Sequence, residues 1–463
     1  MPKGFIIAGT ASGSGKTTLT LALLAALAAR GYRLAPFKVG PDFIDPGHHT
    51  RITGITSRNL DGWMLSKEYN QILFARCSRE AEFAVIEGVM GLYDGYDGRS
   101  EDGSSAQMAK WLDLPVLLVV DARSMARSAA ALLQGFERFD PEVRFAGVVF
   151  NRIGSPRHLG YLREALEGHV KMPCLGGIPR ETAIEIPERH LGLHTVEDHP
   201  LDTPTVNHLV ELVENHVDMD YLASLPDALP SGPPVSLPSP SQLPNEVRIG
   251  VARDAAFCFY YQDNLDLLEE NGAEIVLFTP LGDQTLPENL DGLYFGGGYP
   301  ELHASRLSEN LRLREEVRFC SRAGMPIYAE CGGFMYLCDR LTDIEGATRP
   351  MAGCFPFGTR MLDRRRALGY REVRLAKPSP LGPQGLVGRG HEFHYSELVD
   401  VDGTVGKVYE TAPRSGEERH PEGFKIHNTL GSYIHLHFGS NPAMASHFVE
   451  HCRVFRKERS PRL

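Results

Sequence analysis

Two groups of residues in this chain have the types and the spacing that catalysis requires. The first is the glycine-rich stretch 9–18, Gly-Thr-Ala-Ser-Gly-Ser-Gly-Lys-Thr-Thr, which directly follows the apolar run 5–8. The second is Cys331, which follows the run 326–330 and precedes two glycines. A glycine-rich turn that opens a helix binds phosphate, and a cysteine exposed in a tight turn can act as a nucleophile.

The stretch 9–18 predicts an ATP site. Its backbone N–H groups and the positive end of the following helix would hold the phosphates. Lys16 would neutralise the β- and γ-phosphates, and the Thr17 hydroxyl would bind Mg²⁺. Five residues separate Gly9 from Gly15, so the spacing departs from the usual phosphate-loop pattern. The predicted ATP-binding residues are Gly13, Gly15, Lys16, Thr17, Thr18 and Asn151.

Polar residues follow other strand-like runs of the same half. Because parallel strands end at one edge of a sheet, such residues converge on the ligand crevice. Glu87 follows the run 83–86 and opens a glycine-rich segment, where it could face a metal ion. Asn151 follows the run 145–150, where it could hydrogen-bond adenine. We expect Thr17, Asp45 and Glu87 at the metal, and Lys38, Asp42, Asp45 and Asp94 at the substrate or intermediate. His48 and His49 are not assigned to a metal, because adjacent histidines point in different directions.

Cys331 predicts a second site, of a different chemistry. A strand that ends in a tight turn into a helix exposes the thiol near a helix N-terminus, which would lower its pKa. Backbone N–H groups of Gly297, Gly298 and Gly332 could form an oxyanion hole. We choose His437 as the general base. His435 lies on the same face of that strand, so alternation alone does not separate the two histidines.

Bulk properties restrict the class of protein. The chain has 463 residues, enough for two or three domains, and 42% hydrophobic and 23% charged residues, as in globular proteins. A formal net charge of −11 disfavours nucleic acid or an anionic membrane as the partner. No apolar run reaches the roughly 18 residues of a membrane span. The eight cysteines form no C-x-x-C pair, which favours reduced thiols and a cytoplasmic location.

The pattern along the chain predicts an α/β protein with two domains. Short apolar runs at 5–8, 34–38, 83–86, 116–120 and 145–150 alternate with helical stretches, which indicates a parallel sheet covered on both faces. We expect an ATP-binding synthetase domain at 1–225, a Pro/Ser-rich linker at 226–245, and a second α/β domain at 246–463 that becomes rich in strands after about residue 345.

These motifs closely resemble the cobyrinic acid a,c-diamide synthase family of cobalamin biosynthesis. The resemblance covers nearly the whole chain and is most specific at residues 36–45, 57–61 and 87–95. It implies an N-terminal phosphate-loop domain of the dethiobiotin-synthetase type. A class I glutamine amidotransferase-like α/β domain would follow it.

The resemblance also implies an activity. ATP would phosphorylate the a and c carboxylates of cobyrinic acid, and ammonia released from glutamine at Cys331 would then replace the phosphate. The expected ligands are therefore ATP, Mg²⁺, glutamine and a corrinoid polycarboxylate, and the sequence leaves a homodimer open. Most class I amidotransferases have a glutamate two residues after the histidine, but the residue two positions after His437 is Gly439. We therefore expect slow glutamine hydrolysis. The resemblance also suggests that residues 390–396 shape the macrocycle pocket, with a purely structural role equally open.

Three alternatives stay open on sequence. Hydrogenobyrinic acid or nickel sirohydrochlorin could replace cobyrinic acid as the acceptor of the same reaction. A nucleotide-switch ATPase with an inactive amidotransferase domain is the distant alternative, although such proteins carry a lysine early in the loop, where this chain has Ala11.

Overall fold

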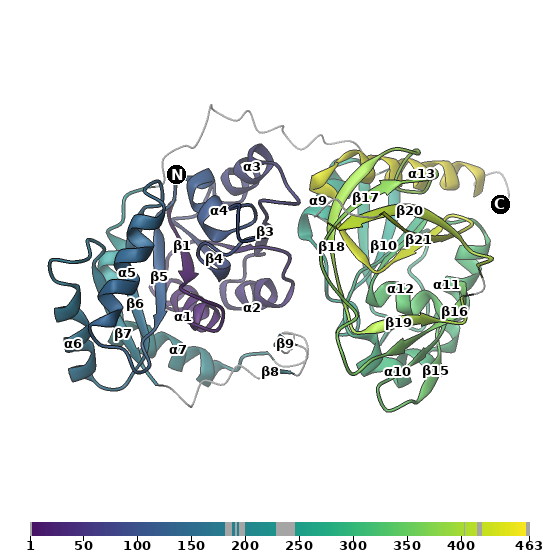
Figure 1. Ribbon diagram of the computed structural model, residues 1–463. Coiled ribbons are helices and arrows are strands. Elements are labelled where there is room, and N and C mark those ends of the chain that lie inside the picture. The colour runs from purple at the N-terminus through teal and green to yellow at the C-terminus, as the bar shows by residue number, and fades with distance from the viewer. Residues whose placement is uncertain are drawn as a thin grey trace. The chain divides into compact units, whose positions relative to one another are not determined.

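A computed structural model describes residues 2–180, 188–189, 192–193, 200–227, 246–401, 403–413 and 419–459. The chain divides into two compact units, Met1–Leu237 and Pro238–Leu463 (Figure 1). Most of the expected linker lies outside the described residues, and the domain boundaries at 225 and 246 stay predictions. None of the described helices is long and apolar enough to cross a lipid bilayer.

The first unit is built on a fully parallel sheet with the strand order β3-β2-β4-β1-β5-β6-β7. Its strands are β1 Lys3–Gly9, β2 Leu34–Val39, β3 Arg58–Leu60, β4 Phe83–Gly91, β5 Val116–Asp121, β6 Phe145–Ile153 and β7 Cys174–Pro179. The five apolar runs identified in the sequence are all strands of this sheet. The short pair β8 Glu188–Arg189 and β9 Gly192–Leu193 lies outside it.

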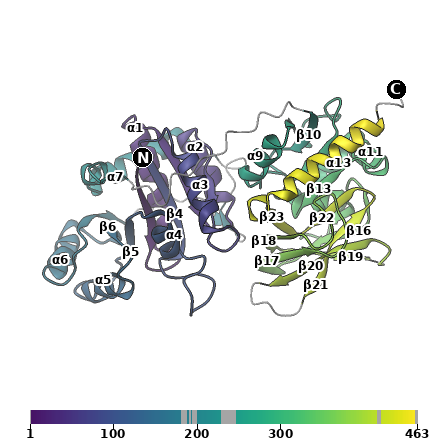
Figure 2. The ribbon, with the colours of Figure 1, turned by 90° about the horizontal axis from the view of Figure 1, so that it is seen from above.

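Helices cover both faces of this sheet (Figure 2). They are α1 Lys16–Ala29, α2 Ile44–Thr53, α3 Lys67–Cys77, α4 Ser105–Leu112, α5 Ser128–Phe139, α6 Pro156–Leu166, α7 Thr203–His216 and α8 Met219–Ala223. Alternate residues of one strand enter opposite cores: Phe5 and Ile7 pack with α1 and α7, whereas Ile6 and Ala8 pack with α4 and α5. The sheet is therefore buried on both sides, and ligands can reach it only at the strand ends.

The second unit has a ten-stranded sheet in the order β11-β10-β12-β13-β22-β21-β20-β17-β18-β23. The parallel part is β11 Ala273–Phe278, β10 Val247–Ala252, β12 Gly292–Phe295, β13 Ile327–Glu330 and β22 Thr429–Ser432. The antiparallel part is β21 His420–Ile426, β20 Gly406–Pro413, β17 Ala367–Leu375, β18 Val387–His394 and β23 Ile434–His437.

A smaller sheet and several helices complete this unit. The sheet has the order β15-β14-β16-β19, formed by Thr348–Pro350, Cys338–Thr342, Phe355–Met361 and Ser396–Val399. The helices are α9 Gln262–Glu270, η1 Pro300–His303, α10 Ala304–Glu309, α11 Leu311–Arg322, α12 Gly332–Leu337, η2 Phe438–Ser440 and α13 Ala443–Arg459. Helix α13 packs on β10 and α9 (Figure 2). Both units are α/β, as the sequence predicts.

Candidate functional site

The phosphate loop joins β1 to α1, where the sequence places it. Gly13 and Gly15 have φ of 75° and 98°, the left-handed conformation that favours glycine. A Cβ on Gly15 would overlap the Nδ2 atom of Asn151, so this position has no room for a side chain. The turn leads into a 14-residue helix, α1, and the combination of turn and helix N-terminus suits phosphate oxygens.

Lys16 and the two threonines begin this helix. Lys16 is 8% exposed, and burial, followed by the charge of Lys38, lowers its pKa. Thr17 and Thr18 are half-buried beside it. The Thr17 hydroxyl donates a hydrogen bond to Glu87 Oε1 at 2.6 Å. This hydrogen bond connects the phosphate loop to the middle of β4.

Glu87 is the centre of a buried group of charged side chains. It is fully buried, and its Oε1 also accepts a hydrogen bond from Lys38 Nζ at 2.9 Å. Lys38 donates to Asp45 as well, and it lies 3.6 Å from Asp42 Oδ2. The structure thus brings together four residues that the sequence predicted separately, from the end of β2, the middle of β4, and the start of α2 with the turn before it.

The charges in this group depend on one another. Burial disfavours the charged form of each buried member, but the carboxylates of Asp45 and Glu87 hold the pKa of Lys38 above its usual value. Burial also acts against the Glu87 carboxylate, but Lys38 and hydrogen bonds from His49 and Thr17 outweigh it and lower the Glu87 pKa. Burial and the neighbouring Asp42 and Glu87 charges raise the pKa of Asp45. Lys38 and Glu87 form a buried ion pair at the centre of the site.

This donor set fits Mg²⁺ bound together with a nucleotide. Hydroxyl and carboxylate oxygens are the ligands that Mg²⁺ prefers, and the ion usually takes only one or two carboxylates plus phosphate oxygens. Thr17 and Glu87 already lie in hydrogen-bond contact, and Asp45 shares Lys38 with Glu87. The described residues contain no group of three or more His, Cys, Asp and Glu side chains that would hold a metal by itself.

Three predicted residues support the loops of this site. Asn151 Nδ2 donates to the Ser14 carbonyl at 2.9 Å, so Asn151 binds the phosphate loop itself, and its contact with adenine stays a prediction. Asp94 Oδ2 accepts from the backbone N–H of Gly91 at 3.1 Å. Asp42 Oδ1 accepts from the Ile44 N–H at 2.8 Å and so caps the start of α2.

Two residues at this site, His49 and Ser57, were not predicted from the sequence. His49 Nε2 lies 2.8 Å from Glu87 Oε2, and its Nδ1 lies 3.2 Å from Ser57 Oγ. One signal was available: His49 is four residues after Asp45, which places both on the same side of a helix.

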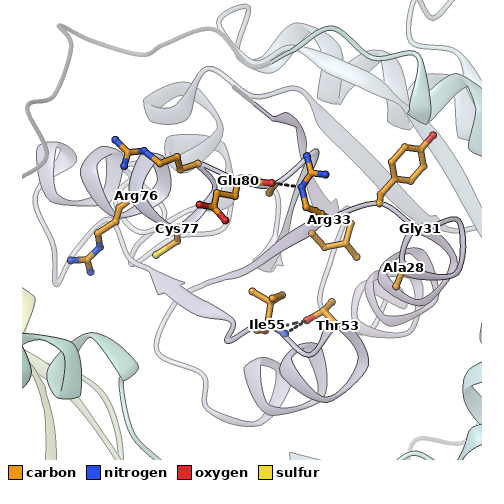
Figure 3. Close-up of a pocket in the computed structure, with 12 residues that line it drawn as sticks. Ala28, Gly31, Arg33, Thr53, Ile55, Arg76, Cys77 and Glu80 are labelled. Carbon is orange, nitrogen blue, oxygen red and sulfur yellow. Dashed lines mark hydrogen bonds between the residues drawn. The ribbon is translucent and has the colours of Figure 1, made fainter. Parts of the chain in front are cut away.

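One cavity in this unit lies elsewhere. It measures about 620 Å³ and is lined by residues that include Arg33, Thr53, Ile55 and Cys77 (Figure 3). Arg33 Nε donates to the Glu80 carbonyl at 2.7 Å there. Because these residues adjoin the start of β2 and β4, whereas Lys38 lies near the end of β2 and Glu87 in the middle of β4, this cavity is not part of the phosphate-binding site.

Cys331 occupies the sharp turn between β13 and α12. Its φ is 45°, which is uncommon for a residue with a side chain and fits a turn that projects a nucleophile. A Cβ on Gly332 would lie 2.8 Å from Pro300 Cδ and 2.9 Å from the Gly298 carbonyl oxygen. The turn is therefore packed tightly against the glycine loop that follows β12.

Two expectations about this site need correction. Burial, followed by the charges of Glu301 and Glu330, raises the pKa of the Cys331 thiol, although the backbone N–H of Gly332 partly opposes this. The expected lowering by the helix is not found, because α12 has only six residues and the thiol is buried. In the oxyanion loop, the Gly297 N–H already donates to the Phe259 carbonyl at 3.1 Å, so as placed it is not available to an oxyanion.

The two histidines of β23 have different surroundings. His437 Nδ1 accepts from the Gly439 N–H at 3.1 Å, and its Nε2 lies 3.9 Å from Asp263 Oδ2 near the start of α9. His435 lies directly against Gly297, stacks on His391 at 4.9 Å, and has Nδ1 3.8 Å from Glu330 Oε2. Burial lowers the pKa of both rings, that of His437 to about 3.

The register of β23 on β18 places the histidines relative to the thiol. The Phe393 carbonyl of β18 lies 3.9 Å from Cys331 Sγ. His435 pairs with His391, two residues before Phe393, whereas His437 pairs with Arg389, four residues before it. Since a strand rises about 3.4 Å per residue, His437 lies about 7 Å further along β18 from Phe393 than His435 does.

Comparisons with known proteins find one family match in each of the two compact units. Residues 5–193 match the CobQ/CobB/MinD/ParA nucleotide binding domain, and residues 248–443 match the CobB/CobQ-like glutamine amidotransferase domain. The fold and the two sites thus define a nucleotide-binding domain joined to a glutamine amidotransferase domain, as in glutamine-dependent amidating ligases.

The relatives identify the family. "Cobyrinate a,c-diamide synthase" of Syntrophotalea carbinolica is 45% identical over 450 residues, which cover 97% of this chain and 98% of the relative. The protein of the same name from Priestia megaterium is 41% identical and covers 98% of each chain. The one from Salmonella typhimurium is 42% identical over 97% of this chain and 98% of its own. The chain belongs to the cobyrinate a,c-diamide synthase family, as the sequence motifs predicted.

Proposed function

We propose that this protein converts the a and c carboxylates of cobyrinic acid into amides, with ATP as the source of energy and glutamine as the source of nitrogen. Relatives that match over 98% of their own length are named cobyrinate a,c-diamide synthase. This chain also has two candidate sites of the kinds that such a reaction needs, the phosphate loop and Cys331. The proposal rests chiefly on the presence of two sites in one chain. Cys331 lies in a turn with a positive φ that packs against a glycine loop, and the phosphate loop lies beside the buried Lys38–Glu87 ion pair.

The first step takes place at the phosphate loop. A carboxylate oxygen of the acceptor attacks the γ-phosphorus of ATP, and the bond between this phosphorus and the β-phosphate oxygen breaks. ADP is the leaving group, and the acceptor becomes an acyl phosphate. The backbone N–H groups of the loop and Lys16 hold the phosphates in place. Thr17, Glu87 and Asp45 would hold Mg²⁺, which when bound offsets the negative charge of the phosphates.

The second step takes place at Cys331. The Cys331 sulfur attacks the side-chain amide carbon of glutamine, and a histidine of β23 takes the thiol proton and passes it to the leaving nitrogen. Ammonia departs, and water later hydrolyses the glutamyl thioester. The backbone N–H groups of Gly298 and Gly332, two glycines that lie against each other, would donate to the oxyanion.

Ammonia then attacks the carbonyl carbon of the acyl phosphate, phosphate leaves, and the nitrogen loses a proton to give the amide. One ATP and one glutamine are consumed for each amide, so the diamide requires two of each. The buried thiol and its raised pKa support slow turnover of glutamine in the absence of the other substrates.

The test is Cys331→Ser. It should abolish glutamine-dependent amidation, because serine at this position is a far weaker nucleophile, but amidation with ammonium chloride should stay within about threefold of wild type. Product is measured by chromatography and mass spectrometry, with cobyrinic acid, hydrogenobyrinic acid and nickel sirohydrochlorin assayed side by side. Equal loss with both nitrogen sources would contradict the division of labour, and amidation of another acceptor alone would contradict the choice of substrate.

A further inference from the structure

His49 lies behind the nucleotide site without being one of its expected ligands. It sits on α2 and its side chain is completely buried. Its Nε2 lies 2.8 Å from Glu87 Oε2, and its Nδ1 lies 3.2 Å from Ser57 Oγ. A chain of polar contacts therefore runs from Ser57 through His49 and Glu87 to Thr17 in the phosphate loop.

The chemistry of the two ends fixes the direction of the central hydrogen bond. An ionised carboxylate oxygen can only accept, so His49 Nε2 carries a hydrogen and donates it to Glu87. Ser57 contacts the other ring nitrogen and thereby fixes the orientation of the ring. The Ser57 backbone N–H is itself held by Thr50 Oγ1 at 3.0 Å, so the far end of the chain is anchored on α2.

Glu87 divides its two oxygens between different tasks. Oε1 faces the catalytic side, where it accepts from Thr17 and Lys38, and Oε2 faces His49. The side chains of His49 and Glu87 are both completely buried, so without His49 the Oε2 atom would lose its hydrogen-bond donor away from water. A buried acceptor without a donor lowers the stability of the folded state. The carboxylate would then turn to share both oxygens with Lys38 or Thr17, and Oε1 would lose its fixed position.

We propose that His49, held by Ser57, is a positioning residue that orients the Glu87 carboxylate towards Thr17 and the Mg²⁺ bound with ATP. This inference rests on the proposed function, since it assigns Mg²⁺ to the Thr17–Glu87 corner of the loop. Residues behind metal-binding carboxylates typically change metal affinity about 10- to 100-fold when they are removed.

The test uses His49→Ala with His49→Gln as the matched control. Glutamine keeps an N–H donor near the position of Nε2, whereas alanine removes it. Binding of the non-hydrolysable analogue AMP-PNP is measured by calorimetry, once over a series of Mg²⁺ concentrations and once in EDTA. His49→Ala should raise the Mg²⁺ concentration for half-maximal binding about 10- to 100-fold and change binding in EDTA less than about threefold. His49→Gln should recover most of the affinity.

Ser57→Ala supplies a second variant that leaves the buried ring in place. It should shift the Mg²⁺ requirement in the same direction by a smaller factor, and it decides the question if His49→Ala does not fold. The inference is overturned if both of these variants keep the wild-type Mg²⁺ requirement, or if His49→Gln is as impaired as His49→Ala.

The binding assay separates this inference from the proposed function. It needs no acceptor acid and no glutamine, so wild-type protein that binds Mg²⁺ with AMP-PNP but never forms an amide would refute the function alone. Binding of AMP-PNP in EDTA provides a check that the first unit of each variant is folded, because His49, Ser57 and the phosphate loop all belong to that unit.

Discussion

At the scale of single residues, the assignment of the general base depends on a difference that the sequence does not contain. His435 and His437 point to the same side of β23, so a period of two treats them alike. The pairing with β18 distinguishes them, because it places His435 nearer to the Phe393 carbonyl that contacts the thiol. The sequence-based choice of His437 thus stays a prediction, and the geometry favours His435.

Two alanine variants decide between these histidines. His435→Ala should lower glutamine-dependent amidation about 10²- to 10⁴-fold, the usual contribution of a general base, and leave the ammonium-dependent reaction within about threefold. His437→Ala should have a much smaller effect, because Nδ1 of that ring accepts from Gly439 and Nε2 faces Asp263. Initial rates with both nitrogen sources provide the measurement. A greater loss in His437→Ala would restore the assignment made from the sequence.

At the scale of elements, Glu330 connects three strands of the second sheet. Its Oε1 accepts from Tyr328 of β13 at 2.5 Å and from the Leu436 N–H of β23 at 3.0 Å, and its Oε2 accepts from Tyr294 of β12 at 3.0 Å. Burial raises the pKa of this carboxyl to about 7, although the three hydrogen bonds oppose the increase. The folded state therefore holds a proton that the unfolded chain releases near pH 4.5.

This linkage predicts how stability depends on pH. Because the pKa of Glu330 is raised in the folded state, ionisation of this carboxyl lowers the free energy of unfolding. The stabilisation is fully present below about pH 4.5 and is lost as the pH rises to about 7, by about 3 kcal/mol in total. Glu330→Gln should flatten the decline of the thermal unfolding midpoint between about pH 5 and pH 8. The exposed Glu410→Gln serves as the control. Parallel curves for Glu330→Gln and wild type would show that the carboxyl is already ionised in this range.

Elements differed in how well the sequence revealed them. Strands β1, β2, β4, β5 and β6 contain runs of four to six mostly apolar and buried residues, so they stand out without knowledge of their partners. Between about residues 345 and 435, exposed and buried residues follow one another less regularly, and strands pair with distant partners, as β13 does with β22. The phosphate loop and the Cys331 turn were predictable because their glycines are local, whereas the raised thiol pKa arises from packing by distant elements.

At the scale of the whole molecule, each half has its own hydrophobic cores. The cores that cover the seven-stranded sheet consist only of residues up to Leu225, and those of the second sheet begin at Val247. A substitution in one unit that leaves that unit folded should therefore leave the chemistry of the other unit intact. The proposed reaction needs both activities, so the chemistry of each half must be measured separately from the complete amidation reaction.

Lys16→Ala tests this independence from the side opposite to Cys331→Ser. Removing the buried Lys16 ammonium should lower ATP-dependent amidation at least about 100-fold with either nitrogen source. The reason is that the phosphates of ATP would lose the positive charge that the folded protein holds in place beside them. Glutamine hydrolysis without nucleotide should stay within about threefold of wild type, since Cys331 and the histidines of β23 belong to the other unit. Glutamate release and amide formation are followed in parallel. If hydrolysis fell as steeply as amidation, the two catalytic centres could not be independent, and Lys16 would have to affect the folding or the catalytic geometry of the amidotransferase half.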